Sequence, residues 1–364
     1  MRDYLNINKV RASLSLLLIG MLLTACSDDS DRVDGETDVL QLVAFSRGMT
    51  DLEPVAATRA IPDGYHEYLG PSSIGVYTTS ADEAPTSIRT FSYATDQWKS
   101  LVNVKNHEKY YIYGYMPASS DVHCIISKRE GMDYSQGAVL TFPELPPVLG
   151  EDFCVVTGVQ QLNAKTDPVS LTPRVFAFTG QQTGSNFACL MLDHLYSCVK
   201  FRFLVDSDSD YDKLRTIKLK KVELKTTQEV SYPLTVTMKA GEDYKVAWNS
   251  ATPRSNDYMP LHVSEDGDIL SATTPKEVEG YFAPKSDVAG NLVLQCTYDV
   301  YDKNVTTEHP DGNLVRPHCV AVNKLPAVVA GVNRRTVLTL KVTPTYLYVL
   351  SEPDLDNPTI TIGN

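Results

Sequence analysis

Residue types that commonly do chemistry are spread along this 364-residue chain without a recognisable spacing. The seven histidines stand singly, and no metalloprotease, hydrolase, P-loop or dinucleotide-binding motif occurs. No nucleophile, base and orienting residue can be assembled from the sequence. We therefore predict that the protein is not an enzyme, with no catalytic residue, no metal site and no cofactor.

One run of acidic residues resembles a calcium loop in part. Carboxylates alternate through 206–212, and such a run can supply oxygen ligands at the first, third and fifth positions. However, Tyr211 stands where an EF-hand loop needs glycine, and Ile217 stands where it needs a bidentate glutamate. The run is therefore interpreted as a solvated turn between two strands.

A cysteine near the N-terminus has a sequence context typical of lipid attachment. Arg2, Lys9 and Arg11 give a basic start, and the apolar run 14–23 is too short to span a membrane. Leu-Thr-Ala then precedes Cys26, as in a bacterial lipoprotein signal. We predict that residues 1–25 are a signal peptide and that Cys26 carries the lipid, with a second acyl chain such as palmitate needed for stable anchoring.

A second processing site is predicted at Arg59 and Ala60. The sequence Ala-Thr-Arg-Ala in a polar linker is common, but here it separates a strand-like segment from the rest of the chain. Residues 26–59 are therefore interpreted as a pro-segment that a protease removes by cutting after Arg59.

The pro-segment contains a strand pattern that is apolar on both faces. Leu40, Leu42 and Ala44 share one face, while Val39, Val43 and Phe45 share the other. Such a run is unsuited to an exposed tail and suited to a buried position inside a sheet. We predict that it fills a groove from which it is later displaced.

The six remaining cysteines and the charge balance constrain the compartment and the partners. An even number of cysteines permits disulfides in an exported protein, but their wide spacing equally fits buried free thiols. The net charge of −12 argues against nucleic acid as a partner, because binding nucleic acid requires clustered Lys and Arg. Contact with a membrane is expected through the lipid on Cys26.

The body of the chain shows the pattern of an all-β sandwich. Helical periodicity is nearly absent beyond the signal peptide, and short alternating or apolar runs end at Gly, Pro, Asn or Asp. Predicted strands are 73–78, 110–116, 122–127, 138–142, 153–158, 187–192, 197–205, 217–225, 234–238, 244–248, 292–301 and 335–343, and predicted loops include 144–151 and 308–317. A polar stretch at 181–186 divides the body into two predicted sandwiches, 60–184 and 185–364.

One predicted strand carries an irregularity. Between Ile217 and Lys225 the apolar positions change phase at Lys220 and Lys221, which predicts a β-bulge with the lysines on the solvent face.

Several short motifs, taken in order, resemble the fimbrillin family of pilus subunits of Bacteroides and Porphyromonas relatives. They are the lipobox 23–26 with its acidic followers, Thr58-Arg59-Ala60, the aromatic run 110–117 ending in proline, the strand motif 192–201 that contains His194, Tyr281-Phe282-Ala283-Pro284, and 333–343. Together they cover essentially the whole chain, and His194 is read there as a structural residue.

The resemblance implies two tandem transthyretin-like β-sandwich domains and assembly by strand exchange. In that scheme an arginine-specific protease cuts after Arg59, and a C-terminal strand of the next subunit fills the vacated groove. Ile360 and Ile362 share a face and are the candidate donor residues, in a second domain that spans 185–364. The contacts are head to tail and build a polymer of fimbrial subunits, so the protein passes from outer-membrane lipoprotein to extracellular fimbrium, where it supports adhesion.

Two alternatives stay open at the level of sequence. A surface glycan-binding β-sandwich lipoprotein would present tyrosines and the two tryptophans, Trp98 and Trp248, to sugar rings. Within the fimbrial interpretation, stalk, tip and anchor subunits all fit, although the presence of Arg59 favours a stalk or tip. The host ligand and the exact domain boundary are not specified by any motif.

Overall fold

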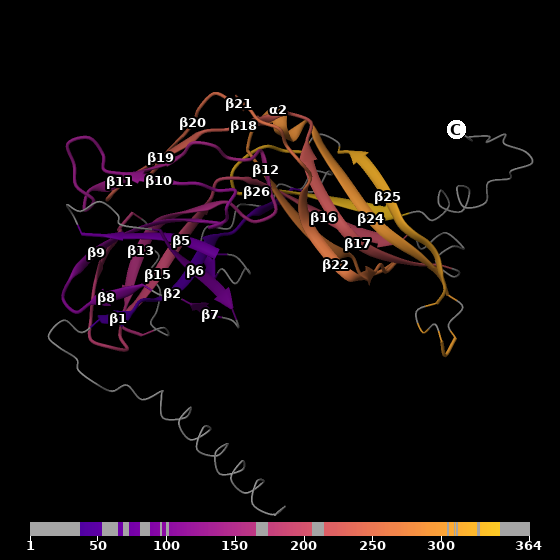
Figure 1. Cartoon of the computed structure of the whole chain (residues 1–364). Helices are drawn as coiled ribbons and strands as arrows, with labels where there is room; N and C mark the ends of the chain where they lie inside the picture. Colours follow the sequence, from indigo (N-terminus) through magenta and orange to yellow (C-terminus); the bar gives the residue numbers. More distant parts are fainter. Residues whose placement is uncertain are drawn as a thin grey trace, which may run out of the picture.

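The structure is a computed structural model of the chain and describes residues 37–52, 65–67, 73–80, 88–94, 97–99, 102–164, 174–205, 215–303, 306–308, 310, 312–325 and 328–342. Almost all regular structure in these residues is β-strand (Figure 1). The described helix α2 (Ser286–Ala289) has a single turn, and no helix among the described residues is both long and apolar enough to cross a membrane.

The largest sheet has nine strands. Its path places a strand from the predicted pro-segment, β2, between β15 and β7, and β4 also pairs with β2. The strands in order are β13 (Cys154–Leu162), β15 (Phe187–His194), β2 (Gln41–Arg47), β7 (Gln97–Lys99), β6 (Ile88–Ala94), β5 (Ser73–Thr79), β9 (Lys109–Met116) and β14 (Ala177–Thr179), with β4 (Tyr65–Glu67) to the side.

A four-stranded sheet covers part of the nine-stranded sheet. It consists of β10 (Ile125–Ser127), β11 (Gly137–Phe142), β19 (Leu234–Lys239) and β20 (Lys245–Trp248). Aromatic rings join the two layers, since Phe142 of β11 lies 5.3 Å from the ring of Tyr115 and 5.1 Å from that of Phe153, centroid to centroid. The two sheets thus form a sandwich with a buried aromatic core.

A second pair of sheets contains most of the later strands. One sheet has the order β12 (Val148–Leu149), β23 (Lys276–Phe282), β16 (Ser197–Val205), β26 (Arg334–Val342) and β3 (Thr50–Leu52). The other has β22 (Met259–Ile269), β17 (Arg215–Thr226), β24 (Leu292–Asp302) and β25 (Leu314–Lys324). Fully buried Phe201 and Phe282 of the first sheet belong to the same apolar cluster as Leu224 and Leu294 of the second. The predicted all-β sandwich class is confirmed.

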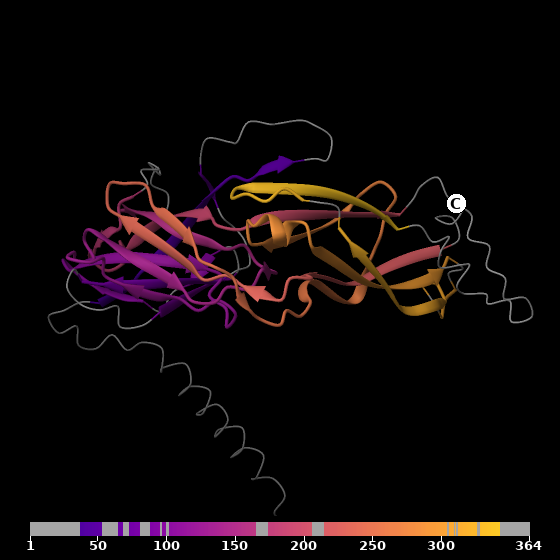
Figure 2. The same cartoon turned by 90° about the horizontal axis from the view of Figure 1, so that it is seen from above.

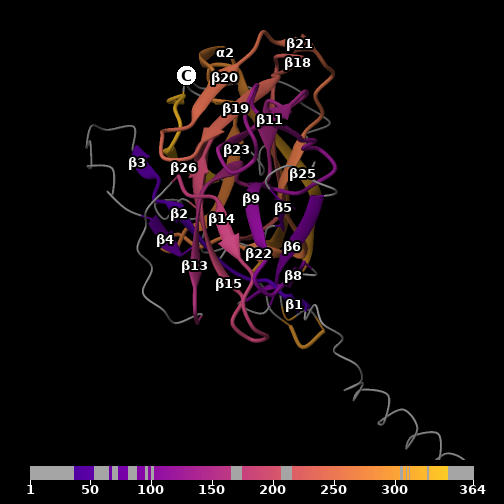
Figure 3. The ribbon, with the colours of Figure 1, turned by 90° about the vertical axis from the view of Figure 1, so that its left-hand side faces the viewer.

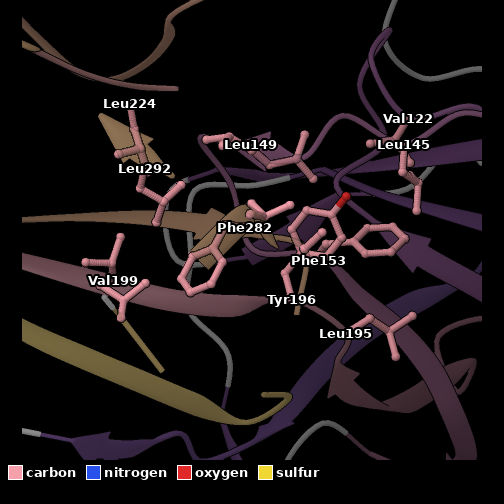
Figure 4. Packing of buried hydrophobic residues seen from close by; sticks show 14 of the residues in the cluster. Val122, Leu145, Leu149, Phe153, Leu195, Tyr196, Val199, Leu224, Phe282 and Leu292 are labelled. Atoms are coloured by element: carbon pink, nitrogen blue, oxygen red, sulfur yellow. The ribbon is translucent and has the colours of Figure 1, made fainter. Parts of the chain in front are cut away.

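The apolar core continues from one pair of sheets to the other. Figure 4 shows Phe153 and Tyr196 beside Phe282, with Val199 and Leu292 farther along the same cluster. Sequence order also crosses the predicted division at 184/185, because β15 joins the first sheet whereas β19 and β20 return to the β11 sheet. The number and bounds of the domains stay a prediction.

Two short ribbons complete the described pairings. β1 (Thr37–Val39) pairs with β8 (Asn103–Lys105), and β18 (Val230–Ser231) pairs with β21 (Thr252–Pro253). The predicted pro-segment therefore contributes β1, β2 and β3 to three different sheets.

The sequence patterns anticipate many strand positions and one irregularity. The register of β17 against both neighbours shifts between Leu219 and Lys221, which confirms the predicted bulge. The expectation that the lysines of this strand face solvent is wrong for Lys218, which is buried with its amino group 4.7 Å from the ring centre of Tyr301. The predicted loop 308–317 is also too long, since β25 begins at Leu314.

Candidate functional site

The segment that precedes the predicted cut is built into the sheets of the body. Its residues 37–52 form β1, β2 and β3, and β3 pairs in parallel with β26 of the later sheet (Figures 2 and 3). Removal of the segment would therefore change both sandwiches.

Strand β2 makes the main contact. It runs parallel to β15 over six residue pairs, from Gln41 opposite Phe187 to Ser46 opposite Leu192. On its other side it pairs with β4 and, at Leu42 opposite Trp98, with β7. An interior position of this kind requires apolar side chains on both faces, as the sequence pattern indicates.

The predicted face of β2 lies in a dedicated apolar cluster. Leu40, Leu42 and Ala44 are 0%, 5% and 1% exposed. They pack with side chains of β15, β13, β9, β5 and β8, namely Ala188, Leu190, Leu192, Cys154, Val156, Val159, Ile112, Met116, Ile74, Val76 and Val104. On the opposite face Val43 is buried and Phe45 is half-buried, while Val39 is exposed.

A polar contact fixes the beginning of β2. The Asp38 carboxylate accepts hydrogen bonds from the Gly184 backbone N–H at 2.6 Å and from the Asn186 side-chain amide at 3.1 Å. Asn186 is fully buried, and its backbone carbonyl accepts a hydrogen bond from Gln41 at 2.8 Å. The residue that precedes β15 is thus bonded both to Asp38 of β1 and to Gln41, the first residue of β2.

A second polar contact fixes the end of β2. The Nε2 atom of His194, the last residue of β15, lies 2.6 Å from the backbone carbonyl oxygen of Arg47, the last residue of β2. The Arg47 guanidinium also lies 3.8 Å from the buried Asp193 carboxylate. Strand β2 is therefore held near its beginning by Asn186, the residue before β15, and at its end by Asp193 and His194, the last two residues of β15. Apolar contacts lie between these two polar contacts.

The other ring nitrogen of His194 contacts a buried carboxylate. Its Nδ1 atom lies 2.7 Å from Asp152 Oδ2 and 3.2 Å from Cys154 Sγ, and all three side chains are buried. Burial lowers the pKa of His194, but the Asp152 carboxylate, the Arg47 carbonyl and Asp193 outweigh it, so the pKa is raised. Burial and the Asp152 charge raise the pKa of Cys154 well above its usual range.

Among the described residues, Asp152, Cys154 and His194 form the group whose side chains are of the types that bind metal ions. Their donor atoms lie within 4.8 Å of one another. Two ligands of a tetrahedral zinc ion, each about 2.05 Å from the metal, would lie about 3.3 Å apart. The 2.7 Å between His194 Nδ1 and Asp152 Oδ2 is instead a charge-assisted hydrogen-bond distance. The arrangement is a hydrogen-bonded pair beside a thiol.

The nine-stranded sheet has a connection that does not depend on β2. Besides β15, strand β13 pairs with β9 through Cys154 opposite Met116 and Val155 opposite Tyr115. Without β2, strands β13 and β15 would therefore stay joined to β9, and β15 would present one open edge lined by Ala188, Leu190 and Leu192. A backbone edge beside an apolar trough is the arrangement that accepts an added strand.

The other sequence-predicted site residues lie outside the described residues. These are the lipidation residue Cys26, the cleavage pair Arg59 and Ala60, the donor residues Ile360 and Ile362, and the acidic run 206–212. Sequence reasoning missed Asp38, Asn186 and Asp152, and it read His194 as structural. The sequence could indicate the contact between Asp152 and His194 only in part. The two residues are far apart in sequence and meet through the pairing of β13 with β15.

Two further expectations concern cysteine and tryptophan. The six described cysteines form no disulfide, and five of them are buried, so the open alternative between disulfides and buried thiols resolves toward thiols. Trp248 is not an exposed platform, because its ring packs 5.9 Å from that of Tyr196 and 6.3 Å from that of Tyr232.

Neither a family model nor a curated protein matches this sequence. Among solved structures, a fimbrial protein from Bacteroides vulgatus is similar at 13% identity and a TM-score of 0.32, over 84% of this chain and 95% of that one. A candidate cell adhesion protein from Bacteroides fragilis is similar at 12% identity and a TM-score of 0.37, over 84% and 93%. Candidate polysaccharide-binding proteins from Bacteroides thetaiotaomicron are similar at 8% identity and a TM-score of 0.30, over 84% and 92%. The solved structures that this chain is similar to thus include Bacteroides fimbrial and candidate adhesion proteins.

Proposed function

We propose that this chain is a structural subunit of a cell-surface fimbria that is exported as a lipoprotein and assembled by protease-triggered strand exchange. It is a component of an adhesive filament and not an enzyme. Its partners are further fimbrial subunits, an arginine-specific protease and, before processing, the outer membrane through a lipid on Cys26.

The observation that carries this proposal is the place of β2. A strand that lies before a predicted protease site fills an interior position of the largest sheet, next to β15. Cutting after Arg59 would free residues 26–59 from the chain, so that β2 is then held only by non-covalent contacts. A strand from a second copy can satisfy the backbone groups of β15 and cover Ala188, Leu190 and Leu192.

The C-terminal segment is the proposed source of the replacing strand. Residues 358–362 are β-capable, and Ile360 and Ile362 share a face in an extended chain. Because the donor end and the acceptor groove belong to different parts of each copy, the contact is heterologous and propagates head to tail.

The trigger is tested with purified precursor and an arginine-specific protease. The expected result is loss of the segment that ends at Arg59, followed by a ladder of multimers in denaturant-free electrophoresis. Arg59→Ala should block both events, whereas the control Arg174→Ala, which changes an arginine of the body, should leave them unchanged. Assembly of Arg59→Ala at the parental rate would overturn the trigger.

The donor is tested separately with Ile360→Asp combined with Ile362→Asp. This chain should still be cut after Arg59 but should not form multimers with itself. It should, however, cap chains of cleaved parental protein, because its acceptor groove is intact. Normal laddering by the double variant would exclude the C-terminal strand as donor, and tight glycan binding by the uncut monomer would favour the glycan-binding alternative.

A further inference from the structure

His194 has hydrogen-bond acceptors in front of both ring nitrogens. Arg47 presents a backbone carbonyl to Nε2, and Asp152 presents a carboxylate to Nδ1. A carbonyl oxygen can only accept a hydrogen bond, and an ionised carboxylate likewise only accepts. Both contacts are therefore satisfied together only when the imidazole is protonated on both nitrogens.

Loss of one proton leaves one N–H for two acceptors. A hydrogen bond between an N–H and a carboxylate is roughly twice as strong as one between neutral partners. The remaining proton therefore stays on Nδ1, facing Asp152. Nε2 then turns an unshared electron pair toward the Arg47 carbonyl oxygen, and an attraction at the end of β2 becomes a repulsion.

The charged and titratable groups around His194 come from every neighbouring strand. Cys154 belongs to β13, Asp193 to β15 and Arg47 to β2. Cys198 of β16 lies within the electrostatic reach of Asp152. Burial raises the pKa of both thiols well above the usual range, so neither carries charge when the imidazole titrates.

We propose that His194 is a positioning residue that locks β2 against β15 through the Arg47 carbonyl, and that the lock opens when the imidazolium loses a proton. The proposal rests on the proposed function, because β2, the strand that His194 holds, is the strand expected to leave after the cut. Because the acceptor is a backbone carbonyl, the same N–H can fix the register of whichever strand of a second copy next occupies the groove.

The direction of the pH effect follows from the surroundings of the imidazole. A histidine whose pKa is raised in the folded state contributes its stabilisation fully below the unfolded pKa of about 6.5. That contribution is lost as the pH rises through the folded pKa. The segment should accordingly be held more tightly at pH 6 than at pH 9.

The test uses the full chain with a specific protease site placed at 56–61, so that the cut leaves residues 26–55 bound without a covalent link. The measured quantity is the rate at which this segment dissociates, followed by native mass spectrometry from pH 6 to pH 9. The parental chain should release it about tenfold faster at pH 9, the size expected for one hydrogen bond to a charged group.

Two variants and one control test whether His194 and Asp152 cause the pH dependence of release. His194→Phe should release the segment fast at every pH. Asp152→Asn should lower the pH at which the release rate is halfway between its two limits, and because asparagine has the same shape as aspartate the protein should still fold. His262→Phe is the matched control, because His262 pairs with Asp268 at 2.5 Å on β22 and touches no residue of 37–52 in the described contacts. It should behave like the parent.

A flat pH profile in the parent, or parental behaviour of Asp152→Asn, would overturn the lock. If His194→Phe fails to fold, the parent, Asp152→Asn and His262→Phe still decide the question. A pH-dependent release without any multimers would instead contradict the proposed function and leave the lock standing. Multimers with pH-independent release would contradict only the lock.

Discussion

The side-chain amide of Asn186 donates a hydrogen bond to the Asp38 carboxylate at 3.1 Å, so the residue before β15 is bonded to a residue of β1, the strand that precedes β2. The same amide also bonds the Gln181 carbonyl at 3.0 Å, and its oxygen accepts from the Gln181 N–H at 2.8 Å. Asn186 therefore bonds both to its own loop and to a residue of the predicted pro-segment.

Replacement of Asp38 by alanine should weaken the contact of residues 37–52 with the rest of the chain. The variant removes the acceptor of Gly184 and Asn186, and loss of such charge-assisted contacts costs about 1–3 kcal/mol. The free energy of unfolding of the precursor, measured in urea, should fall by this amount. Asp266→Ala at an exposed position of β22 is the control and should be nearly neutral; equal stability of the two variants would show that the Asp38 tie contributes nothing.

Enlargement of Gly114 should destabilise the nine-stranded sheet. A Cβ atom at this position of β9 would lie 2.8 Å from the Gly75 carbonyl oxygen and 2.9 Å from a Val156 methyl carbon. Overpacking of this kind costs about 1–3 kcal/mol. Gly114→Ala should lower the melting temperature by several degrees. Gly290→Ala is the comparison, since its nearest contact is 3.3 Å and a small shift can relieve it; a smaller effect at Gly114 than at Gly290 would contradict the packing argument.

The sequence predicts strands best where one face is buried and the other is wet. The alternation over Ser197–Val205 gives the bounds of β16 without error, and the phase change at Lys220 locates the bulge of β17. Burial periodicity is a property of neighbouring residues, so it can be recognised locally.

Strands β22 and β25 were not predicted from the sequence, and one physical reason accounts for both. Both lie at the edges of their sheet and carry many exposed side chains, including Val263, Ile269, Val320 and Val322. An edge strand with mixed exposure lacks a clean period of two, so its residues do not show the local pattern of a half-buried strand.

The candidate site likewise has one part that the sequence indicates and another part that it does not. The apolar pattern of Leu40, Leu42 and Ala44 is local and correctly indicates a buried strand. The ties formed by Asp38 with Asn186, and by Arg47 with His194, join residues about 147 positions apart. No local pattern specifies such contacts, because they arise only when β2 pairs with β15.

Acid should weaken the β16 sheet through Glu277. Hydrogen bonds from Lys200 and Arg202 lower the pKa of this carboxyl. A lowered pKa contributes stability that is present above the unfolded value of about 4.3 and is lost as the pH falls toward the folded value. Glu277→Gln should therefore show a smaller drop in melting temperature between pH 5 and pH 3 than the parent. An identical drop would mean that other carboxylates account for the acid sensitivity.

Thiol labelling should distinguish Cys319 from the other described cysteines. Cys319 is partly exposed, whereas Cys124, Cys154, Cys189, Cys198 and Cys296 are buried. Burial raises the pKa of the Cys319 thiol, so its reaction with a maleimide should be slow but measurable at pH 8. The native mature protein should gain one label and the unfolded protein six, and Cys319→Ser should gain none before unfolding. Rapid labelling of several native thiols would contradict the burial of the two cores.

Truncation of Leu42 should have an effect that depends on the state of assembly. In the uncut chain this side chain is 5% exposed and belongs to the same apolar cluster as Leu190, and removal of a buried leucine costs about 2–5 kcal/mol. Leu42→Ala should therefore lower the unfolding free energy of the uncut chain, while Val39→Ala at 41% exposure should change it little. In the cleaved and assembled form residues 26–59 are gone under the proposed function, so multimers from both variants should match parental multimers in thermal stability. Persistence of the Leu42→Ala deficit in multimers would show that β2 never leaves its groove.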